Sequence, residues 1–132
     1  MNRAVEDARF PVIRLWDILL VPFQGEVTDE VAARLELDVL AEIQRTGAAG
    51  LVLDLTAVWM VDSHLCSVLS NLGRAAALLG ARTVISGMRP EIAMTLQAMG
   101  IELGGLETTR ALEAALESLG IVPQKAKRTR SR

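Results

Sequence analysis

The chain has 132 residues, of which 51% are apolar and 23% charged, a composition typical of one soluble globular domain. One cysteine, Cys66, and one histidine, His64, cannot form an internal disulfide or a zinc site, and four aromatic residues offer no base-stacking platform. The net charge of −2 is unevenly distributed: residues 1–122 have nine arginines against 16 acids and carry −7, whereas the C-terminal end carries +5. Because nucleic acid is itself negatively charged, we expect the acidic domain not to bind it.

The first nine residues are polar and charged and lack the apolar stretch of a signal peptide. The apolar run over 18–23 has six residues, whereas a helix that crosses a bilayer needs about 18. We therefore expect an N-terminal extension at 1–9, no membrane segment and a cytoplasmic location.

A β-hairpin is predicted next, because two apolar, β-branched runs at 12–15 and 18–24 flank Trp16-Asp17. Pro22 lies inside the second run and cannot donate to a strand ladder, which weakens the pattern there.

A long amphipathic helix is predicted after this hairpin. Thr28 and Asp29 are suitable caps, and Gly47 is a suitable stop. The apolar residues recur every four positions, at Val31, Leu35, Val39 and Ile43.

Two further strand–helix units follow. Residues 51–55 and 82–87 are short apolar runs, typical of strands covered on both faces. Asp62-Ser63 begins a helical pattern that continues to Gly80, and Pro90 suits the first turn of another helix, which ends at Gly100.

The last elements are a weak edge strand at 101–106, which contains Gly104-Gly105, and a final helix. We expect Thr108 or Thr109 to cap that helix, which ends at Gly120. Residues 122–132 are expected to form a basic, disordered tail, because 123–132 contain five basic residues and no acid.

Strands that alternate with helices imply a mostly parallel sheet joined by right-handed crossovers. The predicted fold is therefore α/β: one domain at 10–121, with a sheet of four to five strands, an antiparallel N-terminal hairpin and four helices.

Asp62, Ser63 and His64 are the residue types of a hydrolase triad, but they are consecutive. Consecutive helical residues point about 100° apart, so His64 cannot take the Ser63 proton. Phosphate-binding loop motifs are absent, and residues 1–122 contain no lysine. The sequence favours a protein that is not an enzyme and that uses neither a metal nor another cofactor.

Other candidate residues have simple structural interpretations. Spacing alone makes Asp62 a helix cap and Ser63 merely the next residue. Cys66 is expected to be a packed, inert thiol and His64 to be solvent-exposed. Trp59, in the predicted loop, could contact a partner, but we favour a position under the sheet.

Two stretches resemble STAS domains, the anti-sigma-factor antagonist family. Residues 51–56 (LVLDLT), followed by 59–63 (WMVDS), resemble the strand and the Asp-Ser helix start of that family. Residues 87–96 (GMRPEIAMTL), continuing to Met99-Gly100, resemble the stressosome members, especially scaffold proteins of the RsbS type. The resemblance covers about residues 10 to 120.

The resemblance implies a regulatory protein of bacterial partner switching and stress response. It makes Ser63 the phosphoacceptor of a GHKL-type serine kinase, and a PP2C-type phosphatase would remove the phosphate. Phosphorylation would release the kinase, and sensor proteins with related STAS domains would join the chain in a large oligomer. The implied partner-binding residues are Asp62, His64, Thr28, Asp29, Met88 and Arg89.

Two alternatives remain open within the fold. One is a simple antagonist that binds an anti-sigma kinase without a large assembly. The other is an accessory STAS subunit of a membrane transport complex, in which Ser63 would be only part of a helix cap.

Overall fold

The computed structural model describes residues 10–100 and 106–121. The strands are β1 (Ile13–Leu15), β2 (Ile18–Pro22), β3 (Gly50–Asp54), β4 (Arg82–Ser86) and β5 (Glu107–Thr109). The helices are α2 (Asp29–Thr46), α3 (Ser63–Leu78), α4 (Pro90–Ala98) and α5 (Leu112–Ser118). The predicted extension at 1–9 and the predicted tail at 122–132 lie outside the described residues.

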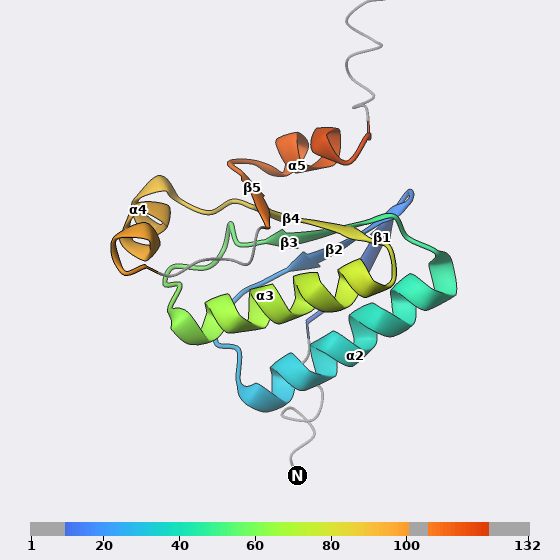
Figure 1. Cartoon of the computed structure of the whole chain (residues 1–132), viewed down its shortest axis with the longest axis horizontal. Coiled ribbons are helices and arrows are strands. Elements are labelled where there is room, and N and C mark those ends of the chain that lie inside the picture. The colour runs from blue at the N-terminus through green and yellow to red at the C-terminus, as the bar shows by residue number, and fades with distance from the viewer. Residues whose placement is uncertain (1–9, 101–105, 122–132) are drawn as a thin grey trace, which may run out of the picture.

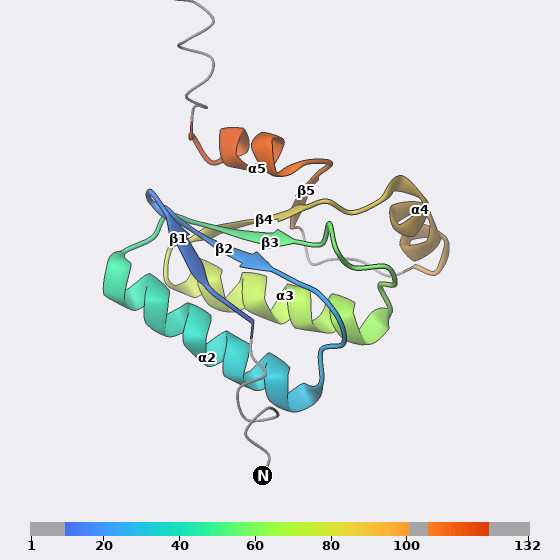
Figure 2. The same cartoon turned by 180° about the vertical axis from the view of Figure 1, so that it is seen from behind.

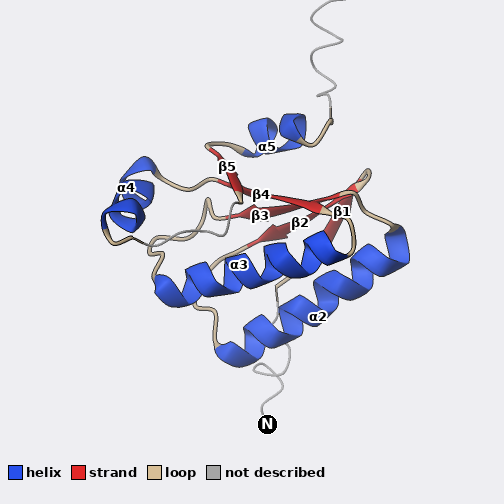
Figure 3. Cartoon of the chain, in the orientation of Figure 1, coloured by secondary structure: helices blue, strands red, loops and turns tan. Residues whose placement is uncertain are grey.

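One five-stranded sheet has the order β1-β2-β3-β4-β5 (Figure 3). The β1–β2 hairpin is antiparallel, and the other neighbouring strands are parallel. Trp16 makes the hairpin turn with φ 53°, and Pro22 lies at the last position of β2. The predicted α/β fold, with a hairpin, a mostly parallel sheet and four helices in the described part, is confirmed.

Two apolar layers cover the two faces of the sheet. Helices α2 and α3 lie on one face, and the short helix α5 lies on the other (Figures 1 and 2). Because strand side chains alternate between faces, Leu51 and Leu53 belong to the larger core, whereas Val52 packs with Ala115 of α5. The larger core also takes the predicted helix positions Leu35, Val39 and Ile43.

Helix α2 has the predicted ends. The Thr28 side chain accepts a hydrogen bond from the Val31 backbone N–H, and Gly47 ends the helix with φ 72°.

In the described ranges, no helix combines the length and the apolar character that a membrane crossing requires.

The predicted start of the last helix is wrong. Thr108 and Thr109 belong to β5, where Thr109 pairs with Ser86, and α5 begins after Ala111 without a side-chain cap. Threonine is β-branched and suits an edge strand as well as a helix cap, so pairing with β4 decides its place. Residues 101–105 of the predicted edge strand lie outside the described residues.

Candidate functional site

Three neighbouring strands end at the same level of the sheet. Pro22, Asp54 and Ser86 are the last residues of β2, β3 and β4, and the parallel register places each opposite the next. The loops that lead into α2, α3 and α4 therefore emerge from one edge, which is where open α/β sheets place their functional residues. Most of the predicted site residues lie in these loops or directly after them.

The loop between β3 and α3 is fixed at its base by a polar cluster. Asp54 Oδ1 accepts hydrogen bonds from the hydroxyls of Thr56 and Ser86, both at 2.8 Å. Ser86 is completely buried, so this bond satisfies a hydroxyl that water cannot reach. Gly87 packs against the same loop, and a Cβ there would lie 2.7 Å from the Thr56 backbone nitrogen.

Ser63 is the first residue of α3, directly after the N-cap. The Asp62 carboxylate accepts a hydrogen bond from the Leu65 N–H at 2.9 Å, as the sequence predicts for a cap. Ser63 is exposed, and its hydroxyl makes no hydrogen bond within the described residues. A group attached to this oxygen would lie near the N–H groups and positive dipole end of α3, where a phosphate is tolerated.

His64 connects the start of α3 to the start of α2. Its Nε2 atom lies 3.0 Å from the carbonyl oxygen of Val27 and 3.5 Å from Asp29 Oδ1. The side chain remains 46% exposed, so the prediction of an exposed residue omitted a tertiary contact between positions 37 apart. This contact brings His64, Asp29 and the Thr28 cap of α2 together beside Ser63.

The predicted position of Trp59 under the sheet is wrong. Trp59 is 81% exposed, and the Arg89 guanidinium carbon lies 4.4 Å from the centre of its ring. Arg89 also donates a hydrogen bond to the Val58 carbonyl at 2.6 Å. A burial prediction based on the size of the indole could not include this cation–π contact from a residue 30 positions later.

Met88 and Cys66 are not on this surface. Met88 retains only 8% of its exposed area and packs in the larger core, so its side chain is not available to a docked protein in this structure. Cys66 is buried as predicted, and burial, with the nearby Asp62 charge, raises the pKa of its thiol. The thiol therefore stays protonated and unreactive at neutral pH.

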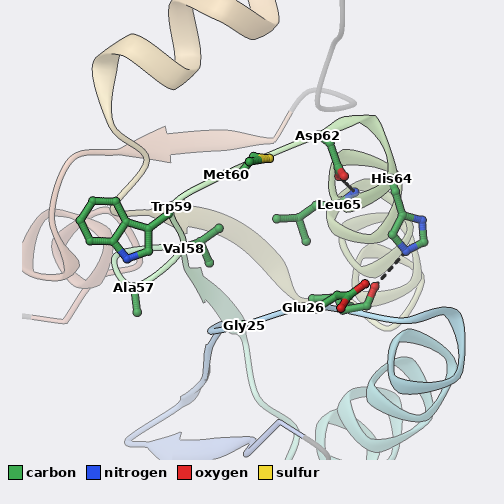
Figure 4. Close-up of a pocket in the computed structure, with 10 residues that line it drawn as sticks. Gly25, Glu26, Ala57, Val58, Trp59, Met60, Asp62, His64 and Leu65 are labelled. Carbon is green, nitrogen blue, oxygen red and sulfur yellow. Dashed lines mark hydrogen bonds between the residues drawn. The ribbon is translucent and has the colours of Figure 1, made fainter.

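A groove of about 390 Å³ runs between the β2–α2 loop and the β3–α3 loop. Trp59 and His64 lie on opposite sides of it, and Asp62 caps α3 at its rim (Figure 4). Its lining residues are Gly25, Glu26, Val27, Ala57, Val58, Trp59, Met60, Asp62, His64 and Leu65. Ser63 is not among them, so the phosphoacceptor candidate lies beside the groove.

The lining residues that sequence reasoning missed include the exposed Met60, the acidic Glu26 and Val27, whose carbonyl His64 contacts. Two large apolar residues in a short loop, Trp59-Met60, were the available signal for an exposed contact surface. Across the residues that the structure describes, no three His, Cys, Asp or Glu side chains are grouped so that they could hold a metal ion.

Comparisons with known proteins agree with this architecture. The RsbT co-antagonist protein RsbRA of Bacillus subtilis (strain 168) is 27% identical over 116 residues, 87% of this chain and 42% of RsbRA. The chain thus spans less than half the length of the first curated relatives that it matches.

Two solved structures are similar in both sequence and fold. One comes from a study of the molecular architecture of the stressosome, described as a signal integration and transduction hub. That structure is 32% identical in sequence and has a TM-score of 0.72, and the match covers 83% of this chain and 95% of the other. A serine-to-glutamate variant of RsbS from Moorella thermoacetica is 31% identical, with the same TM-score and coverage.

The family model of the STAS domain matches residues 10–114, which include the sheet, the groove and the first turn of α5. This range lies within the predicted domain at 10–121. The chain therefore belongs to the STAS-domain family, and its relatives include proteins of the stressosome.

Proposed function

We propose that this chain is a non-catalytic scaffold of a bacterial stress-response pathway, which holds a GHKL-type serine kinase until Ser63 is phosphorylated. The similarity to stressosome proteins supports the coarser part of the proposal, a regulatory role in partner switching. The observation that carries the finer part is the exposed Ser63 hydroxyl at the capped start of α3.

The position of Ser63 suits modification by another protein. A kinase supplies ATP, metal and base, so its substrate needs only an accessible hydroxyl in a fixed place. The Asp62 cap fixes the first turn of α3, and the contact of His64 with Val27 holds this turn against the β2–α2 loop. The nearest imidazole is thus engaged with a backbone carbonyl, which supports a substrate role for Ser63 rather than a nucleophilic one.

Phosphorylation would change the electrostatics of this edge. A phosphoserine adds about −1.5 to −2 charges at neutral pH, here beside the Asp62 carboxylate. A docked kinase presents nucleotide phosphates to the acceptor, so the new phosphate would meet like charge and would also be desolvated in the interface. Both effects favour release of the kinase. Removal of the phosphate by a PP2C-type phosphatase would restore binding.

The direct test is to incubate the purified chain with the GHKL-type kinase of its own genome and ATP, and to locate the phosphate by mass spectrometry. Ser63→Ala should abolish incorporation. Ser67→Ala is the matched control, because Ser67 is also exposed and lies one turn further along α3. Phosphate on another residue, with Ser63→Ala unaffected, refutes the proposal.

The switch itself is tested by binding. Ser63→Asp should weaken the complex with the kinase, measured by titration calorimetry, and equal affinity would contradict an electrostatic release. The scaffold role predicts a particle much larger than a dimer when the chain is mixed with a sensor protein that carries a related STAS domain. A simple antagonist would remain small, and an accessory transport subunit would co-purify with a transport ATPase.

A further inference from the structure

We propose that Trp59 and Met60 form the apolar anchor by which this chain docks its kinase, with Arg89 as the residue that positions the anchor. This inference rests on the proposed function and deepens it. It predicts that the kinase presents an apolar pocket with a basic rim.

Exposure of the pair is the first argument. Trp59 is 81% exposed and Met60 76%, in a loop where the neighbouring Val58 is buried. Two adjacent large apolar side chains in water are unfavourable for the isolated chain, whereas tryptophan is enriched among the residues that dominate binding energy in interfaces. Met60 precedes Ser63 by three residues, a span of about 10 Å at most, so a protein that reaches Ser63 also reaches the pair.

The orientation of Trp59 is the second argument. Arg89 lies over the indole ring at 4.4 Å and is itself tied to the Val58 carbonyl at 2.6 Å. The ring is therefore held by a side chain from the start of α4 while most of its surface faces solvent. An anchor held in place before binding loses little conformational entropy when a partner covers it.

Charge is the third argument, and it identifies the chemistry of the partner. The charged groups that line the groove are the carboxylates of Glu26 and Asp62, whereas the Arg89 guanidinium over the Trp59 ring lies outside the lining and is engaged with that ring and with the Val58 carbonyl. Asp29 lies just outside the groove, 3.5 Å from His64. Electrostatic complementarity with the groove favours a protein surface with lysine or arginine around an apolar pocket, at a place separate from the nucleotide phosphates that face Ser63 outside the groove.

The central test is the affinity of the purified kinase for the full, unphosphorylated chain, measured by titration calorimetry. Trp59→Ala should weaken binding by about thirtyfold or more, as expected for a dominant interface residue. Trp16→Ala is the matched control, because Trp16 is 65% exposed at the hairpin turn; its affinity should stay within about twofold of wild type. Both variants should have the same midpoint of urea unfolding as the wild type, because each substitution removes a side chain that is mostly exposed.

The outcomes separate this inference from the function on which it rests. A wild-type chain that does not bind the kinase refutes the proposed function, and the anchor with it. A wild-type chain and a Trp59→Ala variant that bind equally well refute only the anchor. A Trp59→Ala variant that changes self-association but not kinase affinity assigns the pair to a contact between copies and also overturns the inference.

Two further measurements test the parts of the argument. Fluorine-labelled tryptophan gives one resonance for each of the two tryptophans, and the kinase should shift that of Trp59 but not that of Trp16. Arg89→Lys keeps the charge but loses the planar contact, so it should weaken binding less than Trp59→Ala does and broaden the Trp59 resonance. Wild-type affinity and an unchanged resonance in this variant would exclude a positioning role for Arg89.

Discussion

Gly87 follows β4 and packs against Thr56 of the β3–α3 loop, which presents Trp59 and leads to Ser63, so its replacement by alanine should both destabilise and distort this edge. Gly87 has φ 81°, a conformation that residues with a Cβ rarely adopt. A Cβ at this position would also lie 2.3 Å from Thr56 Oγ1 and 2.7 Å from the Thr56 backbone nitrogen. The second contact is with backbone, which a change of side-chain rotamer cannot relieve.

The expected loss has two parts. Positive φ costs a residue with a Cβ about 1–2 kcal/mol. Overpacking against a fixed neighbour adds about 1–3 kcal/mol. Gly87→Ala should therefore lower the free energy of unfolding by about 2–5 kcal/mol, a large part of the stability of a small domain.

Gly80→Ala is the control that separates these two parts. Gly80 has φ 88°, but a Cβ there would meet nothing within 4 Å. Gly80→Ala should therefore lower the free energy of unfolding only by the cost of the positive φ angle, about 1–2 kcal/mol. Urea unfolding at 25 °C, followed by circular dichroism, gives both free energies.

The difference between the two variants measures the contact with Thr56. Equal losses in Gly80→Ala and Gly87→Ala would show that the β3–α3 loop moves away at no cost, and would refute the argument that β4 fixes this loop. The same variants should differ in phosphorylation, because only Gly87→Ala displaces the loop that leads to Ser63.

Asp62→Ala should lower the free energy of unfolding by about 1 kcal/mol in urea titrations, because the Leu65 N–H loses its cap, while Asp62→Asn should retain most of it. Asp54→Ala should cost about 1–3 kcal/mol in the same titration, since the buried Ser86 hydroxyl loses its acceptor; Asp54→Asn keeps an acceptor oxygen and should cost less. Cys66 should react with iodoacetamide far more slowly than a free thiol at pH 8 and faster as pH rises, because its raised pKa keeps the thiolate scarce; a rate equal to that of free cysteine would contradict its burial.

Periodicity predicted most of the fold because the apolar patterns are strong and well bounded. The four-residue repeat of α2 has a threonine cap and a glycine stop, and the structure places Leu35, Val39 and Ile43 in the core. The sequence did not predict strand β5, because Glu107–Thr109 is too short to show a period. Its pairing with β4 depends on a tertiary contact that no local pattern encodes.

The site was predictable in its helix starts but not in its contacts. Asp62 and Thr28 act locally, through hydrogen bonds to the residue three positions later, so their capping roles follow from sequence. The bond from Arg89 to the Val58 carbonyl joins residues 31 positions apart, and that from His64 to Val27 joins residues 37 apart. Contacts between residues so far apart in the sequence cannot be predicted before the fold is known, because they form only when three strands end at a common edge of the sheet.

The covering of the sheet on both faces affects how the strands find their register. A one-residue slip usually exposes apolar side chains and buries polar ones, but in β3 both faces are apolar, so the slip carries little such penalty. The correct register of β3 must then be set by the residues at the two ends of the strand. Gly50 fits where a Cβ would lie 2.9 Å from Leu119, and Asp54 bonds to Ser86 only when the strands are correctly aligned. The polar cluster at the candidate site thus also helps to set the alignment of the strands, and its loss would weaken the selection against mispaired strands as well as lower the stability of the domain.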